Sequence, residues 1–264
     1  MDDGDILLHE DRGAVRILTL NRPKARNCLS MDLMRALTGA LADAGGTHEI
    51  RAVVLTGAGP AFSSGHDLKE LTAHRTDPDK GQAFYQDTMQ ACSDLMLAIV
   101  RMPKPVIAAV NGIATAAGCQ LVASCDLAVA AIDSRFATPG VNIGLFCSTP
   151  MVALSRNLTR KAAMEMLLLG EMVEAGDAER LGLVNRVVAP DRVLNEAVEL
   201  GRKIASKPSR TLKIGKEAFY RQAEMPLDEA YRYAASIMVD NMLDAESEEG
   251  IGAFLQKREP QWPR

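Results

Sequence analysis

The chain has 264 residues, of which 47% are hydrophobic, 24% charged and 4% aromatic. These fractions are typical of a soluble globular protein and exclude a disordered, collagen-like or coiled-coil chain as the main architecture. The 30 Lys and Arg residues and the 34 Asp and Glu residues leave a net charge of −4. The charge therefore provides no overall attraction for nucleic acid or for an anionic membrane, and we expect neither partner.

The N-terminal sequence and the hydropathy pattern bear on location. Asp2, Asp3 and Asp5 open the chain, whereas a secretory leader begins with cationic residues followed by an apolar core. Apolar runs such as residues 106–110 are far shorter than the roughly 18 to 20 residues that span a bilayer. On these grounds the sequence predicts a cytoplasmic protein.

The cysteines and histidines give no sign of a disulfide framework or a metal site. The cysteines are odd in number and contain no C-x-x-C pair: Cys28, Cys92, Cys119, Cys125 and Cys147. Such a set favours neither disulfides nor structural zinc, and we expect most of the thiols to be small core residues. His9, His48 and His74 lack the spacing of metal ligands, so no metal is expected.

Strand and helix patterns alternate along the first half of the chain. Residues 15–20 and 52–56 have the composition of buried strands, and between them a helix begins after the capping residue Ser30 and ends at residues 45–46. A helix at 81–101, strands at 106–110 and 127–131, and a helical segment up to 124 follow. Beyond Pro150 the predicted elements are almost all helices, at 161–169, 174–181, 191–205, 208–222, 227–242 and through Phe254 and Lys257. This order predicts an α/β fold with a helical C-terminal third.

Two strand-to-helix joints consist of small residues, at 61–69 (the first bend) and 111–120 (the second bend). Small side chains allow a ligand to approach the backbone, and unpaired N–H groups at a helix start attract negative charge or a polarised carbonyl oxygen. Two such groups converging on one oxygen would form an oxyanion hole. Alternatively, the Gly and Ala residues only permit close packing.

Both bends carry a resemblance that extends in order over residues 12–258. Together with NRPKARN at 21–27, the strings SSGHDLKEL, AAGCQLVASCD and FATPGVNIGLFCSTP resemble the enoyl-CoA hydratase/isomerase (crotonase) family. The resemblance implies an α/β crotonase (ClpP-like) spiral of ββα units at 1–200 and a helical region at 201–264 that assembles homotrimers, often paired as hexamers. It also implies an acyl-CoA ligand of fatty acid metabolism, with coenzyme A as part of the substrate and no permanently bound cofactor.

The family stabilises an enolate-like thioester oxygen with two main-chain N–H groups, which correspond here to those of His66 and Ala117. Phe254 and Lys257 resemble the pair that reaches the CoA of a neighbouring subunit. The other positions that the resemblance places along the ligand are Lys24, Ala25, Arg26, Ser64, Asp67, Leu68, Lys69, Ala116 and Pro139.

The sequence departs from the family's hydratases at both catalytic glutamates, which are replaced by Gln120 and Gly140. The amide of Gln120 is neither an acid nor a base near pH 7, and Gly140 has no side chain that could transfer a proton. We therefore expect ordinary hydration to be nearly abolished. Ser148 occupies the acidic position of some isomerases, and Cys147 and Asn142 are further candidates to line the pocket. A helix start could lower the pKa of Cys147; alternatively, Cys147 is a buried small residue and Ser148 a helix cap.

The side chain of His66 has a possible role of its own. An imidazole at this position could orient a thioester or act as an acid near its ordinary pKa of roughly 6.5. Alternatively, it points into solvent or caps the helix that follows, while Asp67 supplies an N-terminal helix charge.

Two functions remain open within the family. One is an enzyme of altered chemistry, such as isomerisation, thioester hydrolysis or decarboxylation; the other is a protein of lipid metabolism that binds acyl-CoA without turnover. A Rossmann-type nucleotide protein receives little support, because residues 57–59 lack the third glycine of that motif. An RNA-binding role receives none, because the sequence shows no basic patch.

Overall fold

The computed structural model describes residues 5–263, so the acidic residues Asp2 and Asp3 lie outside the described part. Within it, a six-stranded sheet has the order β1-β2-β3-β5-β7-β10. These strands are Leu7–Arg12, Val15–Leu20, Ala52–Gly57, Val106–Val110, Leu127–Ala131 and Arg186–Val188. Only the β1–β2 pair is antiparallel; the others are parallel, as crossover connections require.

A second sheet of short strands has the order β4-β6-β8-β9. Its strands are Ala61–Ser63, Ile113–Thr115, Arg135–Ala137 and Val173–Glu174. Each long central strand leads into a short strand and then into helical structure, giving β3-β4-α2, β5-β6-α4 and β7-β8-η3. This repetition confirms the predicted spiral of ββα units.

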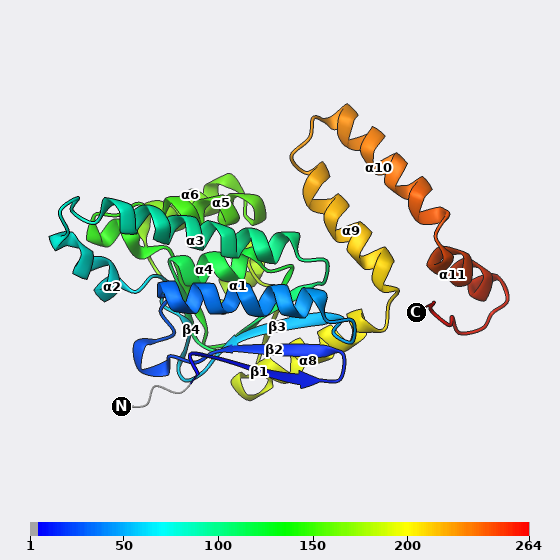
Figure 1. The fold of residues 1–264 in the computed structure, drawn as a ribbon, viewed down its shortest axis with the longest axis horizontal. Coiled ribbons are helices and arrows are strands. Elements are labelled where there is room, and N and C mark those ends of the chain that lie inside the picture. Colours follow the sequence, from blue (N-terminus) through cyan, green and yellow to red (C-terminus); the bar gives the residue numbers. More distant parts are fainter. Residues whose placement is uncertain (1–4, 264) are drawn as a thin grey trace.

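The helices cover both faces of the large sheet (Figure 1). Helices α1 and α3 lie on one face together with α4 to α6, and α8 packs on the other against β2, β3, β5 and β7. The α-helices are α1 Met31–Gly46, α2 Leu68–Ala73, α3 Gln82–Arg101, α4 Ala117–Ser124, α5 Ser148–Asn157, α6 Arg160–Leu169, α7 Ala175–Leu181, α8 Val193–Ala205, α9 Ser209–Gln222, α10 Leu227–Met242 and α11 Ala245–Leu255. Short 3₁₀ helices lie at Pro23–Ala25, His74–Thr76, Pro139–Ile143 (η3) and Pro190–Arg192.

The central strands are apolar on both faces because each face is covered. In β3, Val53 and Leu55 belong to the core cluster under α1 and α3, whereas Ala52 and Val54 belong to the cluster under α8. This explains why residues 52–56 form a continuous apolar run without alternation.

Helices α9 to α11 form an arm that stands off from the rest of the chain (Figure 1). Its attachment includes a buried ion pair in which Lys216 Nζ lies 2.6 Å from Asp126 Oδ2, while the Tyr220 hydroxyl donates to Asp126 Oδ1 at 2.9 Å. Arg156 of α5 also lies 2.8 Å from Glu224, in the loop between α9 and α10. The large apolar side chains exposed on the arm include Phe219, Leu227, Tyr231, Met238, Val239, Met242, Leu243, Ile251, Phe254 and Leu255. Helix α8 crosses residue 200 and packs on the sheet, and the boundary expected at 200 stays a prediction.

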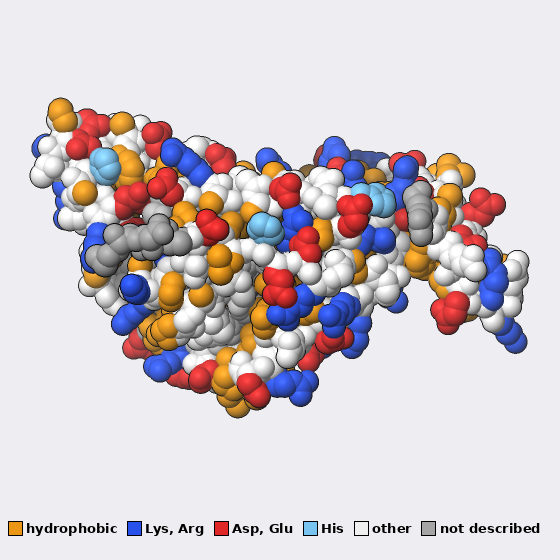
Figure 2. All heavy atoms as spheres, turned by 60° about the horizontal axis from the view of Figure 1, so that its bottom comes forward, with side chains coloured by type: hydrophobic (Ala, Val, Ile, Leu, Met, Phe, Trp, Pro, Cys, Tyr) orange, Lys and Arg blue, Asp and Glu red, His pale blue; other side chains and the backbone are white. Residues whose placement is uncertain are grey.

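Residues 57–59 lead directly into β4 and not into a helix. The dinucleotide motif needs a helix start at this place to receive the phosphates, so the Rossmann alternative is wrong. No helix within residues 5–263 is long and apolar enough to cross a bilayer. Acidic and basic side chains are interspersed over the face that Figure 2 shows, with the arm at its right.

Candidate functional site

The two bends are in direct backbone contact because β4 and β6 are neighbours in the small sheet. The Thr115 hydroxyl donates to the Ser64 carbonyl at 3.2 Å. A Cβ placed on Gly118 would lie 2.2 Å from the Ser63 carbonyl oxygen, and one placed on Gly65 would lie 3.2 Å from Ala117 N. The glycines are therefore required for this approach, as the packing alternative proposed, and the approach brings the start of α4 beside the first bend.

The first bend presents a free main-chain donor. Leu29 N–H donates to Gly65 O at 2.7 Å, and Asp67 N–H donates to Leu29 O at 3.2 Å. In an extended segment, successive N–H groups point to opposite sides, so the intervening N–H of His66 points away from Leu29. It has no acceptor within residues 5–263.

The second bend presents another free donor at the start of α4. Ala117 is the first residue of this helix, whose N–H has no intrahelical acceptor, and no described residue accepts it from elsewhere. The preceding residue, Ala116, has φ 50° and ψ −120°, a conformation that favours glycine and costs about 1–3 kcal/mol in another residue. The bond from Ala116 N–H to Ala137 O at 2.9 Å holds it in place. Residues held in such strained conformations are common at functional sites.

Gln120 is 4% exposed on the inner side of α4, and its Oε1 accepts the Cys92 thiol at 3.7 Å. The helix around it is buried throughout. No described residue hydrogen-bonds to its amide nitrogen. The side chain is therefore a neutral group, fixed at its oxygen, whose two amide N–H donors are both unused.

The backbone of the following loop closes over Gly140. A Cβ at this position would lie 2.5 Å from the Leu145 carbonyl oxygen and 2.8 Å from Cys147 Sγ. The loop is held in this shape by Leu145 N–H, which donates to Gly140 O at 2.9 Å. Gly140 therefore lies in a space that no larger residue can enter unless residues 145–147 move.

Two expectations around this loop need correction, those for Cys147 and Ser148. Burial raises the pKa of the buried Cys147 thiol, an effect that the nearby Gly140 N–H opposes only in part, so the helix start does not make it a thiolate. Ser148 is not the cap of α5, because that position belongs to Cys147 and the Ser148 hydroxyl donates to Phe146 O. Asn142 donates its amide to Gly170 O at 3.3 Å, and its place along the pocket stays a prediction.

The His66 side chain neither reaches solvent with its nitrogens nor caps α2. Nδ1 and Nε2 are both buried and have no hydrogen-bond partner within the described chain. The cap is Asp67, whose Oδ1 accepts the N–H groups of Lys69 at 3.1 Å and Glu70 at 3.4 Å. Burial lowers the pKa of His66, and the Leu29 carbonyl offsets this only in part, so the ring is neutral at pH 7.

Asp67 joins the first bend to the loop before α1. Its Oδ2 lies 3.0 Å from Arg22 Nη2 and accepts the Cys28 thiol at 3.2 Å. Burial opposes ionisation of this carboxyl, but the bonds from Cys28 and Arg22 outweigh it and lower the pKa of Asp67. Asp67 is thus a fixed carboxylate that supports the bend, which confirms the predicted helix charge.

The structure brings together most, but not all, of the positions predicted along the ligand. Ser64 N–H donates to Arg26 O at 3.0 Å, so the segment with the exposed Lys24 and Arg26 contacts the first bend, and that bend leads into α2 with the exposed Lys69. Ala25 and Leu68 lie in the same two segments, and Ala116 and Pro139 lie at the second bend and at the start of η3. Phe254, which is 83% exposed, lies in α11, and Lys257 follows this helix; Figure 1 shows α11 far from α2 and α4, into which the bends lead.

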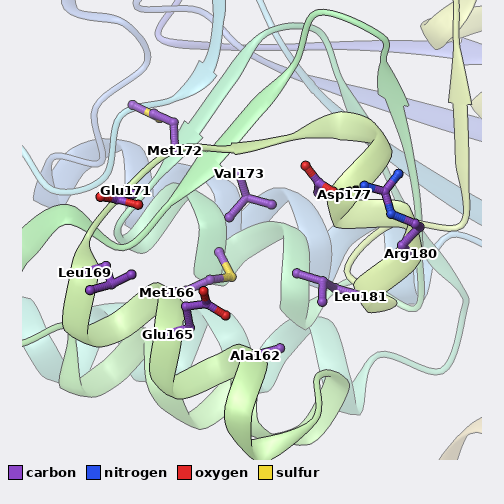
Figure 3. Close-up of a pocket in the computed structure, with 10 residues that line it drawn as sticks. All are labelled: Ala162, Glu165, Met166, Leu169, Glu171, Met172, Val173, Asp177, Arg180 and Leu181. Atoms are coloured by element: carbon purple, nitrogen blue, oxygen red, sulfur yellow. Dashed lines mark hydrogen bonds and ion pairs between the residues drawn. The ribbon is translucent and has the colours of Figure 1, made fainter.

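A separate cavity of about 330 Å³ lies between α6, residues 171–173 and α7 (Figure 3). Met166 and Val173 line it, and the paired Asp177 and Arg180 lie at one edge. It contains none of the predicted site residues, and no sequence motif marks it. Among residues 5–263, no cluster of His, Cys, Asp or Glu side chains is placed to hold a metal ion.

Comparison with known proteins gives a consistent result. Residues 10–264 match the family described as enoyl-CoA hydratase/isomerase. The chain is 46% identical to the mitochondrial enoyl-CoA hydratase domain-containing protein 3 of Homo sapiens, over 94% of this chain and 80% of that protein. The crystal structure of the human protein has a TM-score of 0.92 at 44% identity, covering 98% of this chain and 100% of that one. An enoyl-CoA hydratase of Mycobacterium smegmatis has a TM-score of 0.92 at 52% identity, covering 98% and 99%.

These relatives contradict the predicted cytoplasmic location. The curated proteins from rat, mouse and human, at 44–46% identity, are all named as mitochondrial. The prediction was wrong because it relied on the absence of a leader pattern and of a membrane span, and such absences do not define a compartment.

Proposed function

Because the chain belongs to the enoyl-CoA hydratase/isomerase family, we propose that it binds acyl-CoA or enoyl-CoA thioesters and polarises their carbonyl between the main-chain N–H groups of His66 and Ala117. The observation that carries this proposal is the pair of unpartnered donors on two touching bends. Backbone donors are fixed before the ligand arrives, so they stabilise a developing oxyanion without reorganisation.

The strain at Ala116 supports the same proposal. If the two bends only had to touch, glycine at position 116 would serve equally well. Instead, Ala116 is held at positive φ immediately before the free N–H of Ala117. The helix start adds the favourable end of its dipole to that donor. The site is therefore suited to an oxygen that carries partial negative charge.

Ordinary hydration is not part of the proposal. General acid and base groups each contribute typically ~10² to 10⁴ in rate, and neither Gln120 nor Gly140 can supply one. The closed backbone around Gly140 leaves no room for a carboxylate. Because burial raises the pKa of Cys147, its side chain is a thiol and not a thiolate. Carbonyl polarisation is what remains of the family's chemistry at these positions.

The exposed cations Lys24, Arg26 and Lys69 are placed to receive the phosphates of coenzyme A beside the bends. Coenzyme A is then part of the substrate, and no bound cofactor is needed. We further propose homotrimers or paired trimers in which Phe254 and Lys257 of one copy reach the CoA of its neighbour, since the arm holds both residues away from their own site.

A ligand pair tests carbonyl recognition directly. The purified protein is titrated calorimetrically with butyryl-CoA and with its thioether analogue S-butyl-CoA, which lacks only the carbonyl oxygen. Two hydrogen bonds at about 0.5–1.5 kcal/mol each predict roughly 5- to 150-fold tighter binding of the thioester. Equal affinities would refute carbonyl polarisation, and lack of binding to both would refute the acyl-CoA assignment.

A variant locates the donor. Ala117→Pro removes one N–H at a helix position that accepts proline, and we expect the thioester preference to fall while affinity for the thioether stays within about threefold. Circular dichroism and thermal unfolding show whether the variant is folded. The ligand comparison in the wild-type chain does not depend on that outcome.

The alternative is acyl-CoA binding without turnover, which the closed loop at Gly140 and the neutral Gln120 favour. Crotonyl-CoA and longer enoyl-CoAs distinguish the two branches, with loss of enoyl absorbance and release of free thiol measured together with affinity. Binding without either change supports the binding protein; turnover of either kind supports an enzyme.

A further inference from the structure

The His66 imidazole is the one side chain at the two bends whose polar atoms are all both buried and unsatisfied. A neutral imidazole has one N–H donor and one acceptor nitrogen, and both nitrogens here are buried without a partner. The Leu29 carbonyl is close enough to raise the pKa of His66, but it makes no hydrogen bond to the ring nitrogens and already accepts Asp67 N–H at 3.2 Å. Buried polar groups almost always have a hydrogen-bond partner. Two buried ring nitrogens without one therefore point to a missing partner.

The ring can present its nitrogens in a second orientation. His66 as a residue is partly exposed although both nitrogens are buried, so its accessible atoms are carbons or main chain. Rotation by 180° about the Cβ–Cγ bond exchanges Nδ1 with Cδ2 and Nε2 with Cε1 in almost the same volume. This rotation moves the nitrogens to the other edge of the ring without a change of backbone.

The ring belongs to the residue that supplies the first carbonyl donor. Any thioester oxygen bound by His66 N–H lies within one side-chain length of the ring, and C2 of the acyl group is one bond beyond the carbonyl carbon. Proton transfer needs this proximity first and a suitable pKa second.

The other groups near the bends are already committed. Asp67 is bound to Arg22 and Cys28 and caps α2. Gln120 does not titrate, and Cys147 is held as a thiol. Of these groups, His66 alone carries a neutral nitrogen that can accept a proton near pH 7.

We propose that His66 is a catalytic residue that removes and returns the C2 proton of the bound acyl thioester. This inference rests on the acyl-CoA site proposed above. The C2–H bond breaks, its proton moves to the basic ring nitrogen, and its electron pair forms a C1=C2 bond as the carbonyl electrons move onto the oxygen. The N–H groups of His66 and Ala117 hold the resulting enolate. Return of the proton from the imidazolium to C2 restores the thioester, so no oxidant, reductant or second substrate is required.

The surroundings favour a base. Burial keeps the ring neutral at pH 7, and only the Leu29 carbonyl opposes that effect. The nearby charges of Arg22 and Asp67 are paired with each other, and neither contributes to the shift. A neutral ring accepts a proton, and the imidazolium that forms lies beside the enolate.

Hydrogen–deuterium exchange at C2 tests the step without a net reaction. The full chain is incubated with butyryl-CoA in D₂O, and loss of the C2 proton signal is followed by NMR while affinity is measured by calorimetry. We expect wild type to exchange and His66→Gln to bind within about threefold of wild type but to exchange ~10² to 10⁴ times more slowly. His48→Gln, on an exposed loop, is the matched control and should exchange at the wild-type rate.

The outcomes separate the two proposals. Exchange in wild type should rise with pH and level off at a pKa that is absent from His66→Gln, a readout that a structural role would not produce. Unchanged exchange in His66→Gln would overturn the inference. Tight binding by wild type without exchange would overturn it and leave the proposed function standing, whereas no binding of butyryl-CoA, acetyl-CoA or octanoyl-CoA would overturn both.

Discussion

Replacing Gly140 with alanine tests whether the position of the missing glutamate can hold any side chain. The added Cβ would lie 2.5 Å from the Leu145 carbonyl oxygen and 2.8 Å from Cys147 Sγ. Cys147 can rotate away, but the carbonyl belongs to the backbone and is fixed by the bond from Leu145 N–H to Gly140 O. Reaching even the 3.0 Å of a very tight Cβ contact requires the loop to move by about 0.5 Å.

The magnitude follows from two opposing effects. Gly140 does not have a positive φ, so alanine loses nothing in backbone conformation and gains about 0.4–1 kcal/mol from the stiffer unfolded chain. Displacing packed backbone costs typically about 1–3 kcal/mol. We therefore expect Gly140→Ala to lower the free energy of unfolding by about 1–2 kcal/mol, or Tm by roughly 2–6 °C in a chain of this size.

Urea denaturation followed by circular dichroism measures the change, and Gly39→Ala is the matched control. Gly39 lies exposed within α1 with no atom within 4 Å of an added Cβ, so the same substitution should raise stability by about 0.5–1 kcal/mol. Opposite signs support a closed position. A neutral or stabilising Gly140→Ala would show that the loop yields easily, and the argument that a glutamate cannot fit there would fail.

Three further predictions concern stability. Ala116→Gly should raise the free energy of unfolding by about 1 kcal/mol, because glycine adopts this positive φ without strain. Ala123→Gly within α4 should lower it by about as much. Both variants are measured by thermal unfolding, and a change of the same sign in both would refute the strain at Ala116. Lys216→Met should cost about 3 kcal/mol in urea denaturation because it leaves Asp126, only 16% exposed, without its cation, and a loss below about 1 kcal/mol would contradict a buried ion pair. Because the folded pKa of His66 lies below its unfolded value of roughly 6.5, the unfolded state binds more protons and wild type loses stability as pH falls below about 6.5, by at most about 1.4 kcal/mol per pH unit. His66→Leu should lack this contribution and be more stable than wild type at pH 5.5; equal slopes for the two proteins between pH 7 and pH 5 would contradict the lowered pKa.

The main elements were predictable because their signals are local. The continuous apolar runs at 52–56, 106–110 and 127–131 became β3, β5 and β7, and Ser30 accepts Leu33 N–H as the cap of α1. The short strands β4, β6 and β8 were missed, because three residues carry no periodicity and the pairing between strands defines them. The cap of α5 was assigned one residue too late for a similar reason, since the loop closed over Gly140 determines where that helix begins.

Family, fold and the location of both bends were determined by the sequence itself, since each depends on residues that are neighbours along the chain. Whether two residues far apart touch is decided only when the sheet forms. Ser63 meets Gly118 because β4 pairs with β6, and this contact sets the two free N–H groups on adjoining backbone. The closing of the loop on Gly140 and the unpaired nitrogens of His66 likewise depend on what surrounds those residues in space. For this reason the sequence identified His66 and Cys147 as chemically reactive residues. It could not predict that Cys147 is a thiol or that the His66 nitrogens are buried.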